Sequence, residues 1–228
     1  MLLYSAPLSL FSRKVEIALA EKGVSFDRVL VPFTQTRGYA PKHPAVLAAN
    51  PKRQVPVLID DDLVLYDSTI MIEFLDDKYP DPPLLPREPK ARARCRLLEL
   101  EADEVLLPPV RDLMFRSEPP GPDTARREEQ ELAAVKAEDI ILANYAALAA
   151  KIGAQEYFCG TFSVADIATF MNIHHGLRLG APPLASHENL SAWHSRLAKR
   201  RSFATVIAEM AAADRELSHS VPAYRKAL

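Results

Sequence analysis

The residues best placed for chemistry near the start of the chain are two serines, Ser9 and Ser12, which stand where a short apolar segment gives way to a helical pattern. A helix N-terminus offers free backbone N–H groups and a partial positive charge, and both stabilise a bound anion. The Ser9 hydroxyl is a weak nucleophile, because no His or Asp stands near it in the sequence to act as a base. It is better suited to donating a hydrogen bond to the thiolate of another molecule. The competing interpretation is that both serines only cap the helix.

Two dipeptides further along, Val55-Pro56 and Asp67-Ser68, have the composition of a second binding region. Pro56 either marks the edge of a sheet or forms a cis peptide that exposes the backbone of Val55 to a ligand. Asp67 and Ser68 open a helical pattern and are either caps or ligands. As ligands, Ser68 and the helix end would bind a carboxylate while Asp67 binds an ammonium group, which together match the head group of an amino acid.

The elements that must position these residues follow from the hydrophobic periodicity. Residues 2–4, 25–31, 55–59 and 63–66 are expected strands, while residues 9–22 and 68–78 are expected helices around a long loop over 32–54. Residues 80–89 hold five prolines and predict a stiff connector. Beyond it only helices are expected, over 90–116 with a break at Pro108-Pro109, 124–152, 163–178, 187–200 and 202–217. An α/β unit is therefore followed by an all-helical bundle, and the last residues are expected to be loosely ordered.

The overall composition argues against nucleic acids and membranes as binding partners. The 228 residues carry a formal net charge of −2, with 48% hydrophobic and 25% charged residues, as in ordinary globular proteins. With no basic excess, nucleic acid and anionic membranes are not expected partners, and no apolar run approaches the ~18–20 residues of a membrane span. Cys95 and Cys159 are the two cysteines and lack metal-ligand spacing, so we expect no disulfide framework, no metal and a cytoplasmic protein.

Taken together, several segments resemble the glutathione transferase superfamily. The stretches SLFSRKVEIALAEKG, NPKRQVPVLIDD and LYDSTIMIEFLDDKYPDPPLLP resemble its thioredoxin-like domain, and FCGTFSVADIATF and LSAWHSRLAKR resemble its helical bundle. The resemblance implies a thioredoxin-like α/β N-terminal domain over 1–79, a proline-rich linker over 80–89 and an all-α C-terminal domain over 90–228. It is closest to the serine-type classes such as zeta and tau.

The resemblance also assigns roles to single residues. Ser9 matches the catalytic serine that stabilises the glutathione thiolate, and Ser12 is the alternate. Val55 and the cis proline Pro56 match the contact to the cysteinyl part of glutathione, while Asp67 and Ser68 match the contact to its γ-glutamyl end. The glycine carboxylate needs a donor from the preceding loop; the pattern favours Gln54, then Lys42, among Lys42, His43, Lys52, Arg53 and Gln54.

The second substrate is expected between Ser9 and the first long helix of the bundle. The residues implied for this electrophile pocket are Leu10, Phe11, Val110, Arg111, Met114 and Phe115, although Met and Phe at helical spacing also suit a core. The acidic run from Glu99 to Glu104 is interpreted as a solvated or dimer-facing surface, and His174-His175 as packing residues.

The function implied is conjugation of glutathione, as co-substrate, to a small hydrophobic electrophile by a detoxifying homodimer. Three alternatives stay open. An isomerase of the maleylacetoacetate type is encouraged by NPKRQVP but not by Ser9-Leu10-Phe11, where that class has Ser-Ser-Cys. A dehalogenase or ether-cleaving enzyme is a second alternative. A binding protein that has kept the fold without turnover is the third.

Overall fold

The computed structural model describes residues 1–34, 37–221 and 224. Its N-terminal part contains a four-stranded sheet in the order β2-β1-β3-β4, built from Leu2–Ser5 (β1), Asp27–Leu30 (β2), Val57–Asp60 (β3) and Leu63–Tyr66 (β4). β1 runs parallel to β2, with Leu2 opposite Asp27, and antiparallel to β3, with Leu3 opposite Leu58. The predicted strands and the hairpin between β3 and β4 are confirmed.

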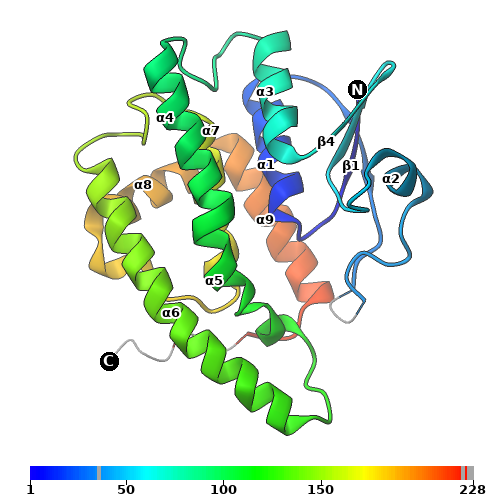
Figure 1. Ribbon diagram of the computed structural model, residues 1–228, viewed down its shortest axis with the longest axis vertical. Coiled ribbons are helices and arrows are strands. Elements are labelled where there is room, and N and C mark those ends of the chain that lie inside the picture. Colours follow the sequence, from blue (N-terminus) through cyan, green and yellow to red (C-terminus); the bar gives the residue numbers. More distant parts are fainter. Residues whose placement is uncertain (35–36, 222–223, 225–228) are drawn as a thin grey trace.

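Helices cover both faces of this sheet (Figure 1). Leu10–Glu21 (α1) and Ser68–Lys78 (α3) lie on one side, where their apolar stripes pack with Leu3 and Leu58 of the sheet. The short helix Pro44–Ala49 (α2) lies on the other side, against a second cluster that contains Val55 and Val57. A mixed sheet with this connectivity and these two helical layers is a thioredoxin-like domain, as the sequence predicted.

The proline-rich segment after α3 is anchored to both halves of the chain. Leu84 and Leu85 are buried. The Leu84 N–H donates to the carboxylate of Asp76 at 2.7 Å, and its carbonyl accepts from the Val164 N–H at 2.9 Å. The connector is therefore fixed by its own leucines and backbone as well as stiffened by its prolines.

The C-terminal part is helical, as expected. Its α-helices are Pro89–Glu101 (α4), Leu107–Arg111 (α5), Thr124–Ile152 (α6), Val164–Arg178 (α7), Glu188–Ala198 (α8) and Arg201–Leu217 (α9). A π-helical turn, Ala102–Leu106, joins α4 to α5, and 3₁₀ turns span Met114–Ser117 and Leu184–Ser186. The predicted break is therefore a π-helical turn just before Pro108-Pro109. It occurs there because a proline has no N–H to donate to the backbone hydrogen bonds of a regular helix.

The start of α7 is joined by hydrogen bonds to other segments of the bundle. Ser163 and Asp166 form the predicted capping box, with Asp166 in the third helical position. The buried Asp166 carboxylate also accepts from the indole N–H of Trp193 at 2.9 Å and from the Phe158 N–H at 3.1 Å. One short motif therefore ties α7 to α8 and to the loop before it.

Two sequence-based interpretations change at this level. Glu99 was expected on a solvated or dimer-facing surface, yet only 1% of it is exposed, because it faces a buried lysine of α1. His174 and His175 pack as expected, with the His174 ring stacked on Phe170 at 5.7 Å between ring centres and His175 buried. The tail expected to be loosely ordered lies largely outside the described residues. Within the described part, no helix is long and apolar enough to cross a membrane.

Candidate functional site

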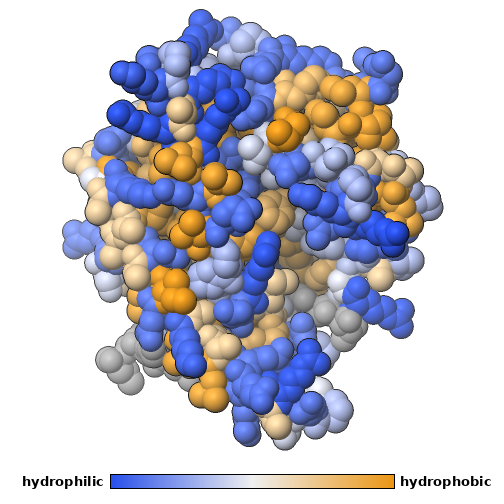
Figure 2. All heavy atoms as spheres, in the orientation of Figure 1, coloured by the Kyte–Doolittle hydropathy of each residue, from blue (hydrophilic) through white to orange (hydrophobic). Residues whose placement is uncertain are grey.

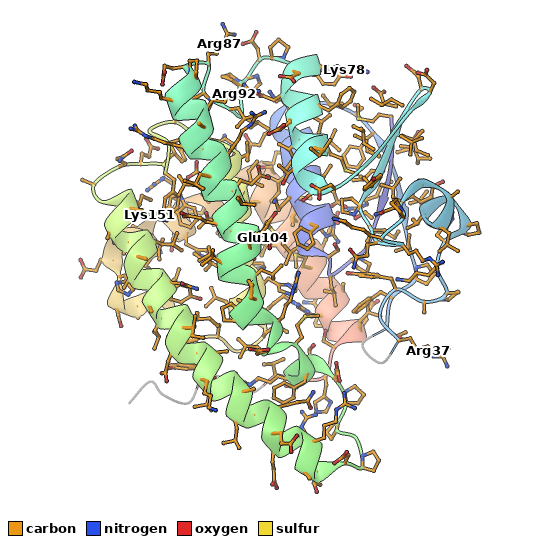
Figure 3. All side chains as sticks on the ribbon, in the orientation of Figure 1. Arg37, Lys78, Arg87, Arg92, Glu104 and Lys151 are labelled. Atoms are coloured by element: carbon orange, nitrogen blue, oxygen red, sulfur yellow. The ribbon has the colours of Figure 1, made fainter. Side chains whose placement is uncertain are left out.

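A cleft of about 680 Å³ lies between the thioredoxin-like domain and the wall formed by α4, the π-helical turn and α5. Glu104, labelled in Figure 3, reaches into the space between this wall and the helices of the N-terminal domain. The residues that line the cleft from the N-terminal domain include Phe11, Asn50, Lys52, Gln54, Val55, Pro56, Tyr66, Asp67, Ser68 and Thr69, and those from the helical part are Arg96, Leu100, Asp103, Glu104 and Arg111. No group of three or more His, Cys, Asp and Glu side chains that could hold a metal ion occurs within the described ranges.

One side of the cleft is made by the turn before β3. The Val55-Pro56 peptide is cis, so of the two interpretations of this proline the cis peptide is the one observed. The turn is held by Asn50, whose amide donates to the Gln54 carbonyl at 2.7 Å and whose side-chain oxygen accepts from the Lys52 N–H at 2.8 Å. Gln54 and Val55 are thereby presented at the cleft surface.

The start of α3 forms the adjoining side. Asp67 has a φ of 80°, and its carboxylate accepts from the Thr69 N–H at 3.0 Å. A non-glycine residue in this region of backbone space is uncommon and marks a place where the surroundings enforce the conformation. The result is that the Asp67 carboxylate, Ser68 and the helix N-terminus share one edge of the cleft.

Ser9 stands at the N-cap of α1 beside this cleft. Its side-chain oxygen accepts from the Ser12 N–H at 3.2 Å, and 6% of Ser9 is exposed. Within the described chain, neither Ser9 nor Ser12 is among the residues that line the cleft, whereas Phe11 between them is. The Ser12 hydroxyl is buried and, in the described part of the chain, has no hydrogen-bond partner.

A buried ionic cluster, which the sequence did not indicate, supports the floor of the cleft. Lys14 is fully buried, and its ammonium lies 2.7 Å from a carboxylate oxygen of Asp103 and 3.2 Å from one of Glu99. Thr69 donates to Glu99 at 3.0 Å, which connects the cluster to the start of α3. Burial alone would lower the pKa of Lys14, but Glu99 and Asp103 outweigh it and raise that pKa. Burial, together with the charge of Asp103, raises the pKa of Glu99 against the opposing effect of Lys14.

The position of Lys14 in the sequence is a signal from which this ionic cluster could have been predicted. Lys14 stands four residues after Leu10 and four before Ala18, so it lies on the apolar face of α1. A lysine on a buried face requires a counter-charge, and the acidic run of the first long helix supplies one.

The residues expected around the second substrate divide into three groups. Phe11 and Arg111 line the cleft. Leu10, Val110 and Phe115 are buried in the main core, and Met114 is 43% exposed. Lys42, which was predicted as the second choice of donor to the glycine carboxylate, lines a separate small hollow, where its ammonium lies 5.6 Å from the ring centre of Tyr39. The cleft therefore brings together Gln54, Val55, Pro56, Asp67 and Ser68, but not Lys42.

Comparison with known proteins adds an independent line of evidence. The model described as "Glutathione S-transferase, N-terminal domain" matches residues 3–83, and that described as "Glutathione S-transferase, C-terminal domain" matches residues 103–201. The solved structure of a glutathione S-transferase from Rhodospirillum rubrum superposes on this chain with a TM-score of 0.75. The two sequences are 26% identical, and the match covers 90% of each chain.

Two curated relatives carry different names. The chain is 45% identical over 100 residues to a stringent starvation protein A homolog of Coxiella burnetii, a match that covers 43% of this chain and 44% of the relative. It is 40% identical over 97 residues to a maleylacetoacetate isomerase of Pseudomonas aeruginosa, over 42% of this chain and 45% of the relative. The matched stretch thus spans less than half the length of either relative.

Proposed function

Because the chain belongs to the glutathione S-transferase family, we propose that it binds glutathione in the cleft and transfers the thiolate to an electrophile. The observation that carries this proposal is the convergence on one cleft of Val55, Asp67, Ser68 and the N-terminus of α3. These groups lie far apart in the sequence, and together they complement a peptide that bears an amino-acid head group.

Each part of glutathione has a proposed partner in this arrangement. Ser68 and the N-terminus of α3 bind the γ-glutamyl carboxylate, and Asp67 binds the ammonium group. The backbone of Val55 pairs with the cysteinyl unit. Gln54, which faces the cleft, is the proposed donor to the glycine carboxylate, with Lys52 beside it; Lys42 faces elsewhere.

Ser9 is the proposed catalytic residue, through a hydrogen bond to the thiolate. A free thiol has a pKa of about 8.5, and each unit by which that pKa is lowered requires about 1.4 kcal/mol of preferential stabilisation of the anion. One charge-assisted hydrogen bond at the positive end of α1 is of this size. The remaining rate enhancement comes from holding the thiolate and the electrophile together, and no covalent intermediate with the protein forms.

Replacing Ser9 by alanine tests this assignment. We expect the pKa of the bound glutathione thiol to rise by about 1 and kcat/KM to fall by about 10- to 100-fold, with little change in glutathione affinity. The thiolate absorbance of the complex and the rate of conjugation to a small aromatic halide measure the two effects. Ser12→Ala, measured beside it, tests the alternate residue. Full activity and an unchanged thiol pKa in Ser9→Ala would exclude the Ser9 role and move the test to Ser12.

The identity of the second substrate separates the remaining alternatives. Phe11 and Leu100 give the cleft an apolar part suited to a small hydrophobic electrophile. The relative named as an isomerase favours measuring cis–trans isomerisation beside conjugation, and dehalogenation or ether cleavage can be measured with the corresponding substrates. A higher kcat/KM for isomerisation than for conjugation would favour an isomerase over a transferase.

A non-catalytic binding role is the second candidate function. It is favoured by the relative named as a stringent starvation protein A homolog and by the position of Ser9 outside the cleft lining. Calorimetry with glutathione decides between the two functions. Binding at millimolar or lower concentration supports the transferase, whereas no detectable heat at millimolar glutathione supports the binding protein.

We also propose a cytoplasmic homodimer formed through α3, α4 and α6. Large apolar side chains are exposed there, with exposed fractions of 50% for Ile70, 54% for Leu97 and 66% for Leu132. Figure 2 shows apolar groups among the charged ones over α4 and α6. A twofold contact would cover them. Sedimentation should give a dimer that Leu97→Glu converts to a folded monomer, whereas a wild-type monomer at micromolar concentration would contradict the proposal.

A further inference from the structure

Arg111 carries a positive charge at the cleft that neither the ion pairs nor the proposed glutathione contacts account for. Four of the six charged side chains that line the cleft in the described chain belong to ion pairs, which join Lys52 to Asp67 at 3.9 Å, Arg96 to Glu73 at 2.6 Å and Asp103 to Lys14 at 2.7 Å. The side chains of the other two, Glu104 and Arg111, have no ion pair or hydrogen bond among the described residues.

Glu104 and Arg111 stand at different places along the helical wall. Glu104 follows Asp103 in the π-helical turn, and Asp103 belongs to the ionic cluster that Thr69 connects to the start of α3. Glu104 therefore lies toward the edge of the cleft proposed for the amino-acid head group of glutathione. Arg111 comes seven residues later, at the end of α5, and seven residues of helix rise about 10 Å. Its charge is thus displaced along the wall from that edge.

The proposed contacts of glutathione leave Arg111 without a partner. One glutathione carboxylate is assigned to Ser68 and the start of α3, and the other to Gln54, so neither is available to Arg111. A guanidinium offers paired donors in one plane, which match the two oxygens of a carboxylate. The positive charge of Arg111 also offsets the repulsion that a second anion would meet from the glutathione thiolate.

We propose that the second substrate of the cleft is an anionic electrophile, whose carboxylate pairs with Arg111 while its apolar body lies against Phe11 and Leu100. The inference rests on the proposed function, because it names the substrate class of the same site. In the transfer, the thiolate sulfur bonds to the electrophilic carbon and the leaving group departs with its electron pair. The carboxylate takes no part in these bond changes, so Arg111 determines specificity. The alternative is that Arg111 is a solvated surface cation that selects no substrate.

Two electrophiles that differ in charge but share a reacting carbon test the proposal on the full-length protein. In a chlorodinitrobenzoate and the corresponding benzamide, the glutathione thiolate displaces chloride from the same ring position. Dividing each kcat/KM by the rate of the uncatalysed reaction with glutathione removes the difference in their intrinsic reactivity. We expect the wild-type protein to prefer the benzoate by about tenfold at low salt, and this preference to shrink as the ionic strength rises.

Three variants assign the preference to one side chain. In Arg111→Gln, the preference for the benzoate should disappear, because its normalised kcat/KM falls about tenfold while that of the benzamide changes less than about twofold. Arg111→Lys keeps the charge without the planar fork and should retain part of the preference. Arg96→Gln is the matched control, because it removes the same charge from the same cleft, but from an arginine already paired with Glu73. It should keep the wild-type preference.

The outcomes separate this inference from the proposed function. Equal normalised kcat/KM values for the two electrophiles in the wild-type protein would overturn the inference, as would an equal loss of preference in Arg111→Gln and Arg96→Gln. Either result leaves the proposed function standing, since both require that conjugation takes place. If calorimetry detects no glutathione binding, or neither electrophile is conjugated, the proposed function is overturned and this inference with it.

Discussion

At the scale of single residues, one buried ammonium group is shared by two carboxylates beneath the candidate site. Lys14 is buried with Glu99 and Asp103, at the point where α1, α3 and α4 meet below the cleft. Placing three ionised groups out of water is costly, and the arrangement holds because each group has a charged partner. The cluster therefore fixes the distance between the two domains at the candidate site.

Replacing Lys14 by methionine should lower the free energy of unfolding by about 3–5 kcal/mol, because Glu99 and Asp103 would stay buried without a counter-charge. Urea unfolding at neutral pH measures the change. The loss should shrink in mild acid, where an unpaired carboxylate can bind a proton. Lys151→Met, which removes a half-exposed pair with Glu101 (Figure 3), should cost at most about 1 kcal/mol. Equal losses in the two variants would contradict the role given to Lys14.

At the scale of elements, the junction at the start of α7 concentrates more hydrogen bonds than any ordinary cap needs. Asp166 accepts from the backbone of Ser163 at 3.0 Å and of Phe158 at 3.1 Å, and from Trp193 at 2.9 Å. These donors come from three different segments of the bundle. Loss of this one side chain would leave all of them buried and unpaired.

We expect Asp166→Ala to lower the free energy of unfolding by about 3–5 kcal/mol, since each unpaired buried donor costs about 1–3 kcal/mol. The matched control is Asp123→Ala at the exposed start of α6, where the carboxylate only accepts from the Arg126 N–H and its loss should cost about 1 kcal/mol. Thermal or urea unfolding of both variants makes the comparison. A loss at Asp166 no larger than that at Asp123 would show that the motif is only a cap.

At the scale of the whole molecule, the helical core contains three histidines that are neutral in the folded state. Burial is the main cause that lowers the pKa of His174 to about 4, of His175 to about 3 and of His194 to about 4. The ordinary value of about 6.5 applies to the unfolded chain. Between these values the unfolded state binds more protons than the folded state, so stability must increase with pH across this window.

The free energy of unfolding should accordingly be highest above pH 6.5 and fall by several kcal/mol as the pH decreases toward 4. Urea unfolding at pH 7.5 and pH 5 measures this difference. In His194→Gln, the number of protons taken up on unfolding in this pH range should fall by about one, because the variant lacks one of the three buried histidines. The His194 ring is stacked on Phe170 in the core, at 4.4 Å between ring centres. A slope that is flat over this range, or unchanged in His194→Gln, would contradict the assignment.

The sequence by itself determined the elements and their order, because their signals are local. The helices over 68–78 and 124–152 have the predicted bounds, and Ser163 with Asp166 caps the predicted helix. Caps, prolines and periodic apolar residues act within a few positions along the chain, so they can be read without knowing the fold. The resemblance of three ordered segments to one family then indicated the residues that converge on the cleft.

Only the tertiary structure decided what each of those residues faces. Leu10, Val110 and Phe115 turn into the core, and Lys14 meets two carboxylates about ninety residues away in the sequence. Such contacts depend on the rotation and packing of the helices against one another. That packing is determined by many residues together, so it cannot be inferred from a short stretch of sequence.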